Sequence, residues 1–200
     1  MTLKEEFILE SMKLFSLKGY VNTGINEIID AVGSSKGGFY NHFAAKEDLF
    51  LAVLAHAQKM WRDRVLFGLK DLQSPQEKVV KILENYRDRY LKDDVNFPGG
   101  CIFITFSVEL DDQNPQLMQE VNKGFTGLKN MIRGFLDEAK TMGELKQDVD
   151  VQQATEMIFS GMIGSSVLFG VEKSTIALDR SINALIVYLS DVTNREVLTR

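Results

Sequence analysis

The chain has 200 residues, of which 44% are hydrophobic and 26% are charged, and this suits one or two soluble domains with a substantial core. The net charge of −5 argues mildly against non-specific binding to nucleic acid. The single cysteine, Cys101, excludes an internal disulfide and fits a reducing cytoplasm. Because there is no uninterrupted run of eighteen apolar residues and the acidic N-terminal stretch is not a secretory signal, we expect a cytoplasmic protein without a membrane segment.

Apolar residues recur at helical spacing along most of the chain, and three prolines with few alternating stretches leave little support for strands. The pattern predicts nine helices, most of them bounded by Ser, Thr, Asn, Pro or Gly signals. Thr23 is expected to cap the second helix, and Ser35 the third. The approximate ranges are 3–18, 24–31, 35–43, 46–73, 75–91, 101–110, 115–142, 149–171 and 175–192.

The short third helix differs from the others because two adjacent glycines open it and three aromatic residues follow. Phe39 and Phe43 are four residues apart and share one face, so we expect them to anchor the helix in a core. Tyr40, Asn41 and His42 point elsewhere and carry hydrogen-bonding groups, and a lysine stands near each end. Together with the helix and glycine turn before it, this pattern predicts a helix-turn-helix whose second helix reads a DNA groove.

The sequence from Gly19 to Leu49 resembles the DNA-binding motif of the TetR/AcrR family of transcriptional regulators. Many positions agree at fixed spacing, which makes the resemblance specific. Two positions depart from the family pattern: Ser34 replaces an apolar residue, and Ala45 replaces a serine cap. The matching segments are Gly19-Tyr20, Thr23, Ile25-Asn26-Glu27-Ile28, Gly33, Ser35-Lys36-Gly37-Gly38-Phe39-Tyr40-Asn41-His42-Phe43 and Lys46-Glu47-Asp48-Leu49.

The resemblance implies an all-α, nine-helix protein with a three-helix DNA-binding domain over 1–47 and a helical ligand-binding and dimerisation domain over 48–200. It implies a repressor, with no enzymatic activity and no cofactor, that a small-molecule effector releases from a near-palindromic operator. Thr23 also suits a purely local role as a helix cap. By matched position, Thr23, Lys36, Tyr40, His42 and Lys46 would contact phosphates, Gly37 and Gly38 would let the backbone approach DNA, and Asn41 and Lys36 would reach base edges.

The second half of the chain is rich in Phe and Met, which adapt to apolar ligands. The same residues suit a helical core, and the sequence alone leaves both interpretations open. No metal-ligand spacing, nucleotide loop or Ser/His/Asp set is present, so the sequence favours binding over catalysis. The residues predicted to line an effector site are Phe103, Phe106, Met131, Phe135 and Met162.

A second segment resembles a TetR subgroup with Gly-Cys at the start of the sixth helix: it reads Pro98-Gly99-Gly100-Cys101-Ile102-Phe103, followed by Glu109-Leu110 and Asn114-Pro115. Some members of that subgroup use the cysteine to sense oxidants or electrophiles, so Cys101 is a candidate redox sensor, with a small buried hydrophobe as the alternative. The last two helices carry apolar stripes and small residues, and the resemblance implies a homodimer through them. The small residues would alternatively make room for ligand.

Two other functions share these residues. A helical small-molecule-binding protein with a vestigial DNA-binding head is the alternative that the acidic N-terminal third supports. A transcriptional activator would use the same DNA contacts as a repressor.

Overall fold

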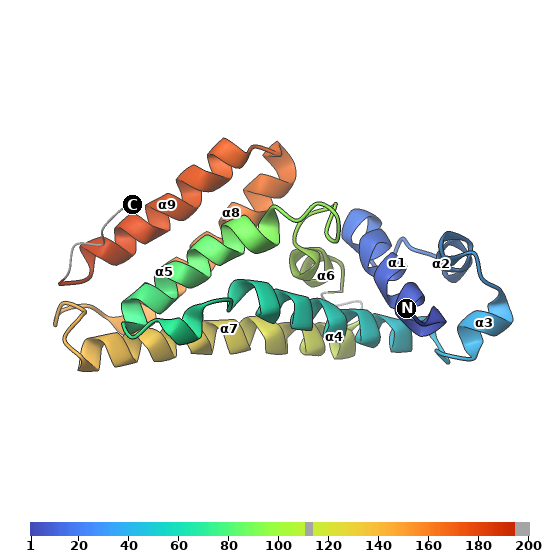
Figure 1. Ribbon diagram of the computed structural model, residues 1–200, viewed down its shortest axis with the longest axis horizontal. Coiled ribbons are helices and arrows are strands. Elements are labelled where there is room, and N and C mark those ends of the chain that lie inside the picture. The colour runs from blue at the N-terminus through green and yellow to red at the C-terminus, as the bar shows by residue number, and fades with distance from the viewer. Residues whose placement is uncertain (111–113, 195–200) are drawn as a thin grey trace. The chain divides into compact units, whose positions relative to one another are not determined.

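The computed structural model describes residues 1–110 and 114–194, and Figure 1 shows that this part of the chain is built from helices. Its nine α-helices confirm the all-α class and the expected number of helices, and an isolated antiparallel bridge joins Leu145 and Thr193. The chain divides into two compact units. The first comprises Met1–Trp61 and Asp93–Gly124, and the second comprises Arg62–Lys92 and Phe125–Arg200.

The first unit begins with a well-capped helix. The Thr2 hydroxyl accepts from the Glu5 N–H at 3.3 Å, and the Glu5 carboxylate accepts from the Thr2 N–H at 2.7 Å, which forms a capping box. The helix ends at Gly19, whose φ of 83° lies in the region that favours glycine. The helices of this unit are α1 (Leu3–Lys18), α2 (Ile25–Val32), α3 (Lys36–Tyr40), α6 (Ile102–Leu110) and the larger part of α4 (Lys46–Val65).

The turn between α2 and α3 closes as the glycine predicts. Gly33 adopts a left-handed conformation at φ 69°, and the Ser34 N–H donates to the Ile29 carbonyl at 3.0 Å. The Ser35 hydroxyl accepts from the Gly38 N–H at 3.1 Å, so the predicted cap of α3 is confirmed.

The predicted cap of α2 is wrong. Gly24 holds the N-cap position without a side-chain hydrogen bond. Thr23 is fully buried, and its hydroxyl donates instead to the Gly19 carbonyl at 2.6 Å. Thr23 therefore closes the turn behind α1 rather than the start of α2.

Two clusters of aromatic rings form the core of the first unit. In one, the Phe7 ring meets those of Phe39 and Phe43 edge-on, with centroids 5.5 and 6.3 Å apart. In the other, the Phe106 ring of α6 packs against Phe50 of α4 at 4.7 Å and against Phe15 of α1 at 6.1 Å. Such aromatic pairs stabilise the fold beyond the burial of their apolar area. Because Phe106 contacts both α1 and α4, α6 shares one core with the helices of the predicted DNA-binding head.

The second unit contains the C-terminal end of α4, and this helix is shorter than predicted. It ends at Val65 rather than near residue 73, because Gly68 turns the chain at φ 76° and a short 3-10 helix, η1 (Leu69–Asp71), follows. The Asn85 amide donates to the Val65 and Phe67 carbonyls at 3.0 and 2.8 Å, and so satisfies backbone groups that the ended helix leaves open.

The remaining helices of the second unit follow the predicted order. The Ser74 hydroxyl caps α5 by accepting from the Glu77 N–H at 3.2 Å, as expected for Ser-Pro. In α8, a Cβ on Gly161 would lie 2.4 Å from Leu185 Cδ2, so this glycine permits the close packing of α8 on α9. The elements are α5 (Pro75–Asn85), the π-helical η2 (Tyr86–Leu91), α8 (Val151–Glu172), α9 (Thr175–Asp191) and most of α7 (Pro115–Thr141).

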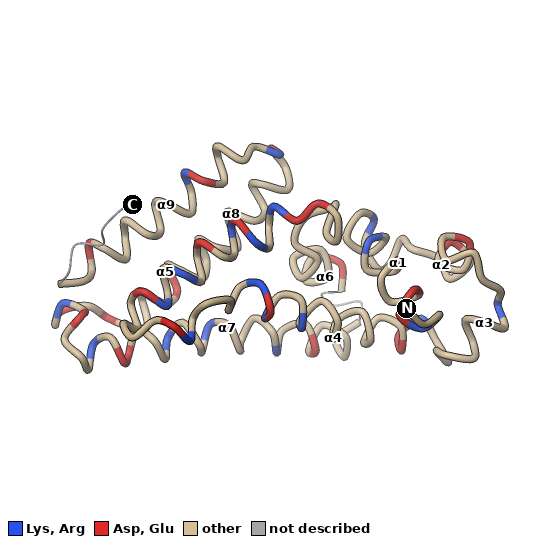
Figure 2. Tube along the Cα trace, in the orientation of Figure 1, with Lys and Arg blue, Asp and Glu red and all other residues tan. Residues whose placement is uncertain are grey.

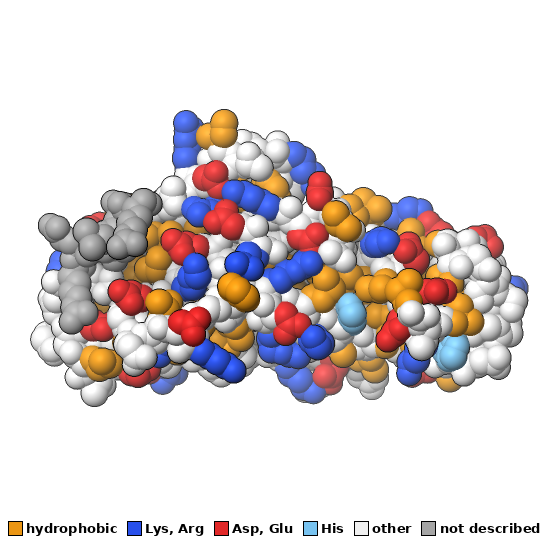
Figure 3. Space-filling view, viewed as in Figure 1, with side chains coloured by type: hydrophobic (Ala, Val, Ile, Leu, Met, Phe, Trp, Pro, Cys, Tyr) orange, Lys and Arg blue, Asp and Glu red, His pale blue; other side chains and the backbone are white. Residues whose placement is uncertain are grey.

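By length and composition alone, α8 is long and apolar enough to cross a membrane. The helix packs along α9, and the core helix of a soluble protein passes the same test. Charged side chains of both signs are interspersed on the face drawn in Figure 3.

Candidate nucleic-acid interface

The short helix α3 has one buried face. The Phe39 and Phe43 side chains are 0% and 3% exposed, and their rings lie 5.7 Å apart over Phe7 of α1. This confirms that the two phenylalanines are core residues. Because both anchors lie within one turn, the orientation of the five-residue helix is fixed by α1 and not by its own hydrogen bonds alone.

The predicted DNA contacts lie on the opposite side of this anchor. Tyr40 is 54% exposed although its ring touches Phe39 edge-on at 5.2 Å, and Asn41 and His42 after it are exposed as well. Lys36 is exposed at the first position of the helix. Figure 2 shows a basic residue and no acidic one along α3. The third helix is shorter than the predicted range of 35–43, because Asn41 and His42 lie in the turn after it. The ammonium and phenol groups of α3 and the amide and imidazole groups of this turn are all exposed to solvent.

The two glycines of α3 differ in their surroundings. Gly37 is exposed, and a Cβ there would meet only the Ser35 hydroxyl at 3.8 Å. At Gly38 a Cβ would lie 2.5 Å from the Ser34 hydroxyl. A side chain at 38 would therefore require the Ser34 hydroxyl to rotate away, whereas a side chain at 37 would meet no close contact.

Lys46 begins α4 and rests on the turn that precedes α2. Its ammonium lies 4.3 Å from the centre of the Tyr20 ring and 3.5 Å from the Val21 carbonyl. Burial lowers the pKa of Lys46, while the carboxylates of Glu47 and Glu109 oppose this shift. The Ala45 N–H donates to the Asp48 carboxylate at 3.1 Å, which compensates in part for the missing serine cap.

Glu109 makes a contact that the sequence did not predict. From α6 it accepts a hydrogen bond from the Tyr20 N–H at 2.7 Å, at the end of α1. A Cβ on Gly19 would lie 1.5 Å from the Glu109 Oε1 atom, so the carboxylate occupies space that only glycine leaves open. The two partners are 89 residues apart in sequence, and no local pattern connects them.

The five residues predicted to line an effector site are divided between the two units. Phe103 and Phe106 belong to the first, where Phe106 is fully buried in the aromatic core. Met131, Phe135 and Met162 belong to the second, where Met162 is fully buried and Lys78 lies over the Phe135 ring at 5.5 Å. Their assignment to an effector site stays a prediction.

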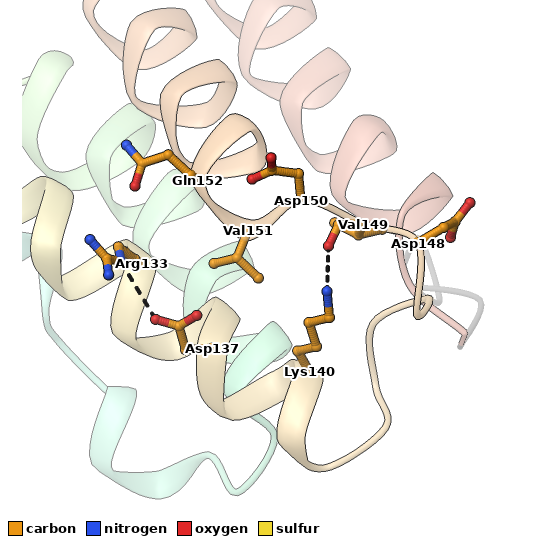
Figure 4. Close-up of a pocket in the computed structure, with 8 residues that line it drawn as sticks. All are labelled: Arg133, Asp137, Lys140, Asp148, Val149, Asp150, Val151 and Gln152. Carbon is orange, nitrogen blue, oxygen red and sulfur yellow. Dashed lines mark hydrogen bonds and ion pairs between the residues drawn. The ribbon is translucent and has the colours of Figure 1, made fainter.

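A hollow of about 530 Å³ in the second unit lies between the end of α7 and the start of α8 (Figure 4). Its lining is polar and includes none of those five residues. Lys140 donates to the Val149 carbonyl at 2.6 Å, and Arg133 lies 3.6 Å from Asp137, so the cations that line it have protein partners. The lining residues are Arg133, Asp137, Lys140, Asp148, Val149, Asp150, Val151 and Gln152.

Cys101 immediately precedes α6, as the sequence predicts. Its carbonyl accepts from the Ile104 and Thr105 N–H groups at 3.1 and 3.2 Å, and so begins the helix. The residue is 8% exposed, so access of a reagent to the thiol requires local movement.

Comparison with known proteins agrees with this architecture. Residues 8–53 match the family model described as bacterial regulatory proteins, tetR family, and residues 75–185 match the tetracyclin repressor-like C-terminal domain. The chain is 26% identical over 186 residues to the fatty acid metabolism regulator protein of Bacillus subtilis (strain 168), covering 91% of this chain and 92% of that protein. It is 21% identical over 188 residues to the transcriptional repressor NemR of Escherichia coli (strain K12), covering 90% and 89%.

Solved structures share the fold. A TetR transcriptional regulator from Chloroflexus aurantiacus J-10-FL superposes with a TM-score of 0.87 at 27% identity, over 96% of both chains. The reduced form of E. coli NemR superposes with a TM-score of 0.75 at 15% identity, over 98% of this chain and all of that one. The chain belongs to the TetR family of bacterial regulatory proteins. It is a DNA-binding transcriptional regulator with an N-terminal helix-turn-helix and a C-terminal helical domain.

Proposed function

We propose that this protein is a homodimeric repressor that reads a near-palindromic operator with α3 of each copy. The observation that carries the proposal is the division of α3 into a face buried on Phe7 and a face of exposed polar groups. Lys36 and Asn41 are proposed to reach base edges, since lysine pairs with guanine and asparagine with adenine. Lys36, Tyr40, His42 and Lys46 are proposed to contact phosphates, and Gly37 and Gly38 are proposed to let the backbone of α3 approach the DNA closely.

Thr23 has a weaker claim to a phosphate than these residues. Its hydroxyl is buried and donates to the Gly19 carbonyl, so it acts on DNA through the shape of the turn. We therefore assign it a supporting role. The division into a DNA-binding domain over 1–47 and a ligand-binding and dimerisation domain over 48–200 remains our proposal for how the two activities are distributed.

The proposed dimer contact lies on α8 and α9. Both helices leave large apolar side chains exposed, with exposed fractions of 53% at Leu168, 65% at Ile176 and 52% at Val187. Gly164 of α8 has nothing within 4 Å of the position of a Cβ, which leaves room for a neighbouring chain. Pairing these faces in two copies would bury them in a four-helix contact.

The proposed effector is a small apolar molecule held by the C-terminal domain, as ligand-responsive repression is typical of this family. The name of the B. subtilis relative, a fatty acid metabolism regulator, favours a fatty acyl chain. Modification of Cys101 is the second candidate trigger, supported by its place at the start of α6 and by the solved reduced form of the NemR repressor. We place the protein in the cytoplasm, where operator DNA is found, and propose no enzymatic activity.

The experiment that tests the proposal is selection of binding sites from random DNA, followed by fluorescence-anisotropy titration of the selected duplex. The expected site is a near-palindrome, and Tyr40→Ala and Lys36→Ala each weaken binding at least tenfold. Lys123→Ala removes an equal charge from an exposed position of α7 and serves as the control. Addition of oleate is expected to release wild-type protein. Failure to select any site supports the small-molecule-binding alternative with a vestigial head.

A further inference from the structure

The segment Asp93–Gly124 has an unusual place in the chain. It belongs to the first unit together with α1, α2 and α3, yet the residues before and after it belong to the second unit. It is therefore a piece of the C-terminal two-thirds of the chain that is packed into the same compact unit as the DNA-reading helices. Its contacts with α1 join this piece of the chain to the helices of the DNA-binding motif within the first unit.

The loop before α6 makes the first of these contacts. The Gly99 N–H donates to the Ser16 hydroxyl at 3.0 Å, and that hydroxyl donates to the Gly100 carbonyl at 3.4 Å. A Cβ on Gly99 would lie 1.7 Å from the Ser16 carbonyl oxygen. The backbone of the loop therefore touches the backbone of α1 directly, at a distance that only glycine allows.

The other end of α6 makes the second contact through Glu109. Its carboxylate accepts from the Tyr20 N–H at 2.7 Å in the space beside Gly19. Between the two contacts, the Phe106 ring packs on Phe15 and Phe50. The helix is thus held to the end of α1 by backbone at one end, by an aromatic ring in the middle and by a carboxylate at the other end.

Tyr20 connects this carboxylate to the DNA-binding residues. Its N–H is held by Glu109, its carbonyl accepts from the Thr23 N–H at 3.3 Å, and its ring carries the Lys46 ammonium at 4.3 Å. The ring also packs on Phe50 at 4.9 Å. A shift of the Tyr20 backbone therefore moves both the residues that lead into α2 and the aromatic ring on which the Lys46 ammonium packs.

We propose that Glu109 is a positioning residue for operator binding: by holding the Tyr20 N–H, it fixes the turn between α1 and α2 and the seat of Lys46 in the conformation that binds DNA. The proposal rests on the proposed function, because it needs an operator to be bound. It also makes Glu109 the point at which a movement of the segment Asp93–Gly124 reaches the DNA-reading helices. Loss of this hydrogen bond would leave the Tyr20 N–H without its acceptor, so the turn would be held only by the Thr23 hydroxyl, the backbone hydrogen bonds and the packing of the Tyr20 ring.

The direction of the change in DNA affinity distinguishes a positioning role of Glu109 from a purely electrostatic one. Removing a carboxylate near a DNA-binding surface removes repulsion from phosphates, so a residue that acts only through its charge would bind DNA more tightly after substitution by alanine. A positioning residue gives the opposite result, because the gain in charge is outweighed by loss of the pre-formed turn. Glu109→Gln keeps an oxygen that accepts from the Tyr20 N–H and loses only the charge.

The test compares operator affinity of full-length wild-type protein, Glu109→Ala, Glu109→Gln and Asp30→Ala by anisotropy. Asp30 is an exposed acid of α2 and serves as the charge-matched control. Glu109→Ala is expected to bind at least fivefold more weakly, Glu109→Gln within twofold of wild type, and Asp30→Ala no more weakly than wild type. Amide hydrogen exchange is measured in parallel: in wild type the Tyr20 amide is expected to exchange at least tenfold more slowly than those of Val21 and Asn22, and Glu109→Ala abolishes that difference.

Equal or tighter binding by Glu109→Ala overturns the proposal, as does a Tyr20 amide in wild type that exchanges as fast as its two neighbours. The exchange measurement on wild type needs no variant, so it can overturn the proposal even where Glu109→Ala does not fold. If wild type binds no selected DNA while its Tyr20 amide is protected, the proposed function has failed rather than the contact of Glu109 with Tyr20.

Discussion

Phe39 and Tyr40 are neighbours in sequence with opposite environments, and replacing each with alanine separates stability from DNA binding. Phe39 is fully buried against Phe7 and Phe43, whereas Tyr40 is 54% exposed. Truncating a fully buried phenylalanine costs about 3–5 kcal/mol, which is a large share of the roughly 5–15 kcal/mol that stabilises a typical domain. Truncating an exposed side chain away from special features changes stability by less than about 0.5 kcal/mol.

Amide hydrogen exchange in α1 and α3 suits this comparison, because it reports the opening free energy of the first unit separately from the second. We expect Phe39→Ala to lower the opening free energy by about 3–5 kcal/mol and Tyr40→Ala to leave it nearly unchanged. Operator affinity should fall for both variants, but Tyr40→Ala should lose affinity while the first unit stays folded. The reasoning is refuted if Phe39→Ala costs less than about 1 kcal/mol, or if Tyr40→Ala loses operator binding only because the head has opened.

Three further predictions concern the packing of α8, the dimer and the turn at Tyr20. Gly161→Ala places a methyl group 2.4 Å from Leu185 Cδ2 and should destabilise the second unit by about 1–3 kcal/mol in urea unfolding. The control, Gly134→Ala in α7, has nothing within 4 Å of the new methyl group and should stabilise the unit by about 0.4–1 kcal/mol. Equal effects of the two substitutions would contradict the packing of α8 on α9. Leu168→Glu should convert the dimer to monomers in sedimentation experiments, while Val108→Glu, at a still more exposed position of α6, should not. A Leu168→Glu protein that stays dimeric would disprove the proposed contact. Burial and the Glu47 carboxylate raise the pKa of Tyr20 to about 12, so the folded chain keeps a proton that the unfolded chain releases near pH 10. Stability of the first unit should therefore fall between about pH 10 and 12, and Tyr20→Phe should reduce that fall; an unchanged pH profile would argue against it.

The sequence was sufficient wherever a signal was local. The Ser35 cap, the Gly33 turn and the burial of Phe39 follow from the spacing of neighbouring residues, and the structure confirms them. The helix-turn-helix could be placed for the same reason. These features need only the preferences of a few consecutive residues.

Features that depend on distant partners were missed or wrong. The helix from Lys46 continues in the apolar pattern beyond Val65, but Gly68 and the Asn85 amide end it there. Thr23 is of a residue type that commonly caps helices, yet its hydroxyl donates a hydrogen bond to the Gly19 carbonyl instead. Glu109 lies in a segment that resembles a TetR subgroup, but its role appears only when α6 lies beside the end of α1.

The most direct test of the account is the salt dependence of operator binding by wild type and by Lys36→Ala. Each lysine that neutralises a phosphate or approaches DNA contributes to the slope of log K against log salt. We predict saturable, salt-sensitive binding by wild type and a slope about one smaller in magnitude for Lys36→Ala, with Lys123→Ala unchanged. Equal slopes and affinities for all three proteins would contradict the central claim that the exposed face of α3 binds DNA.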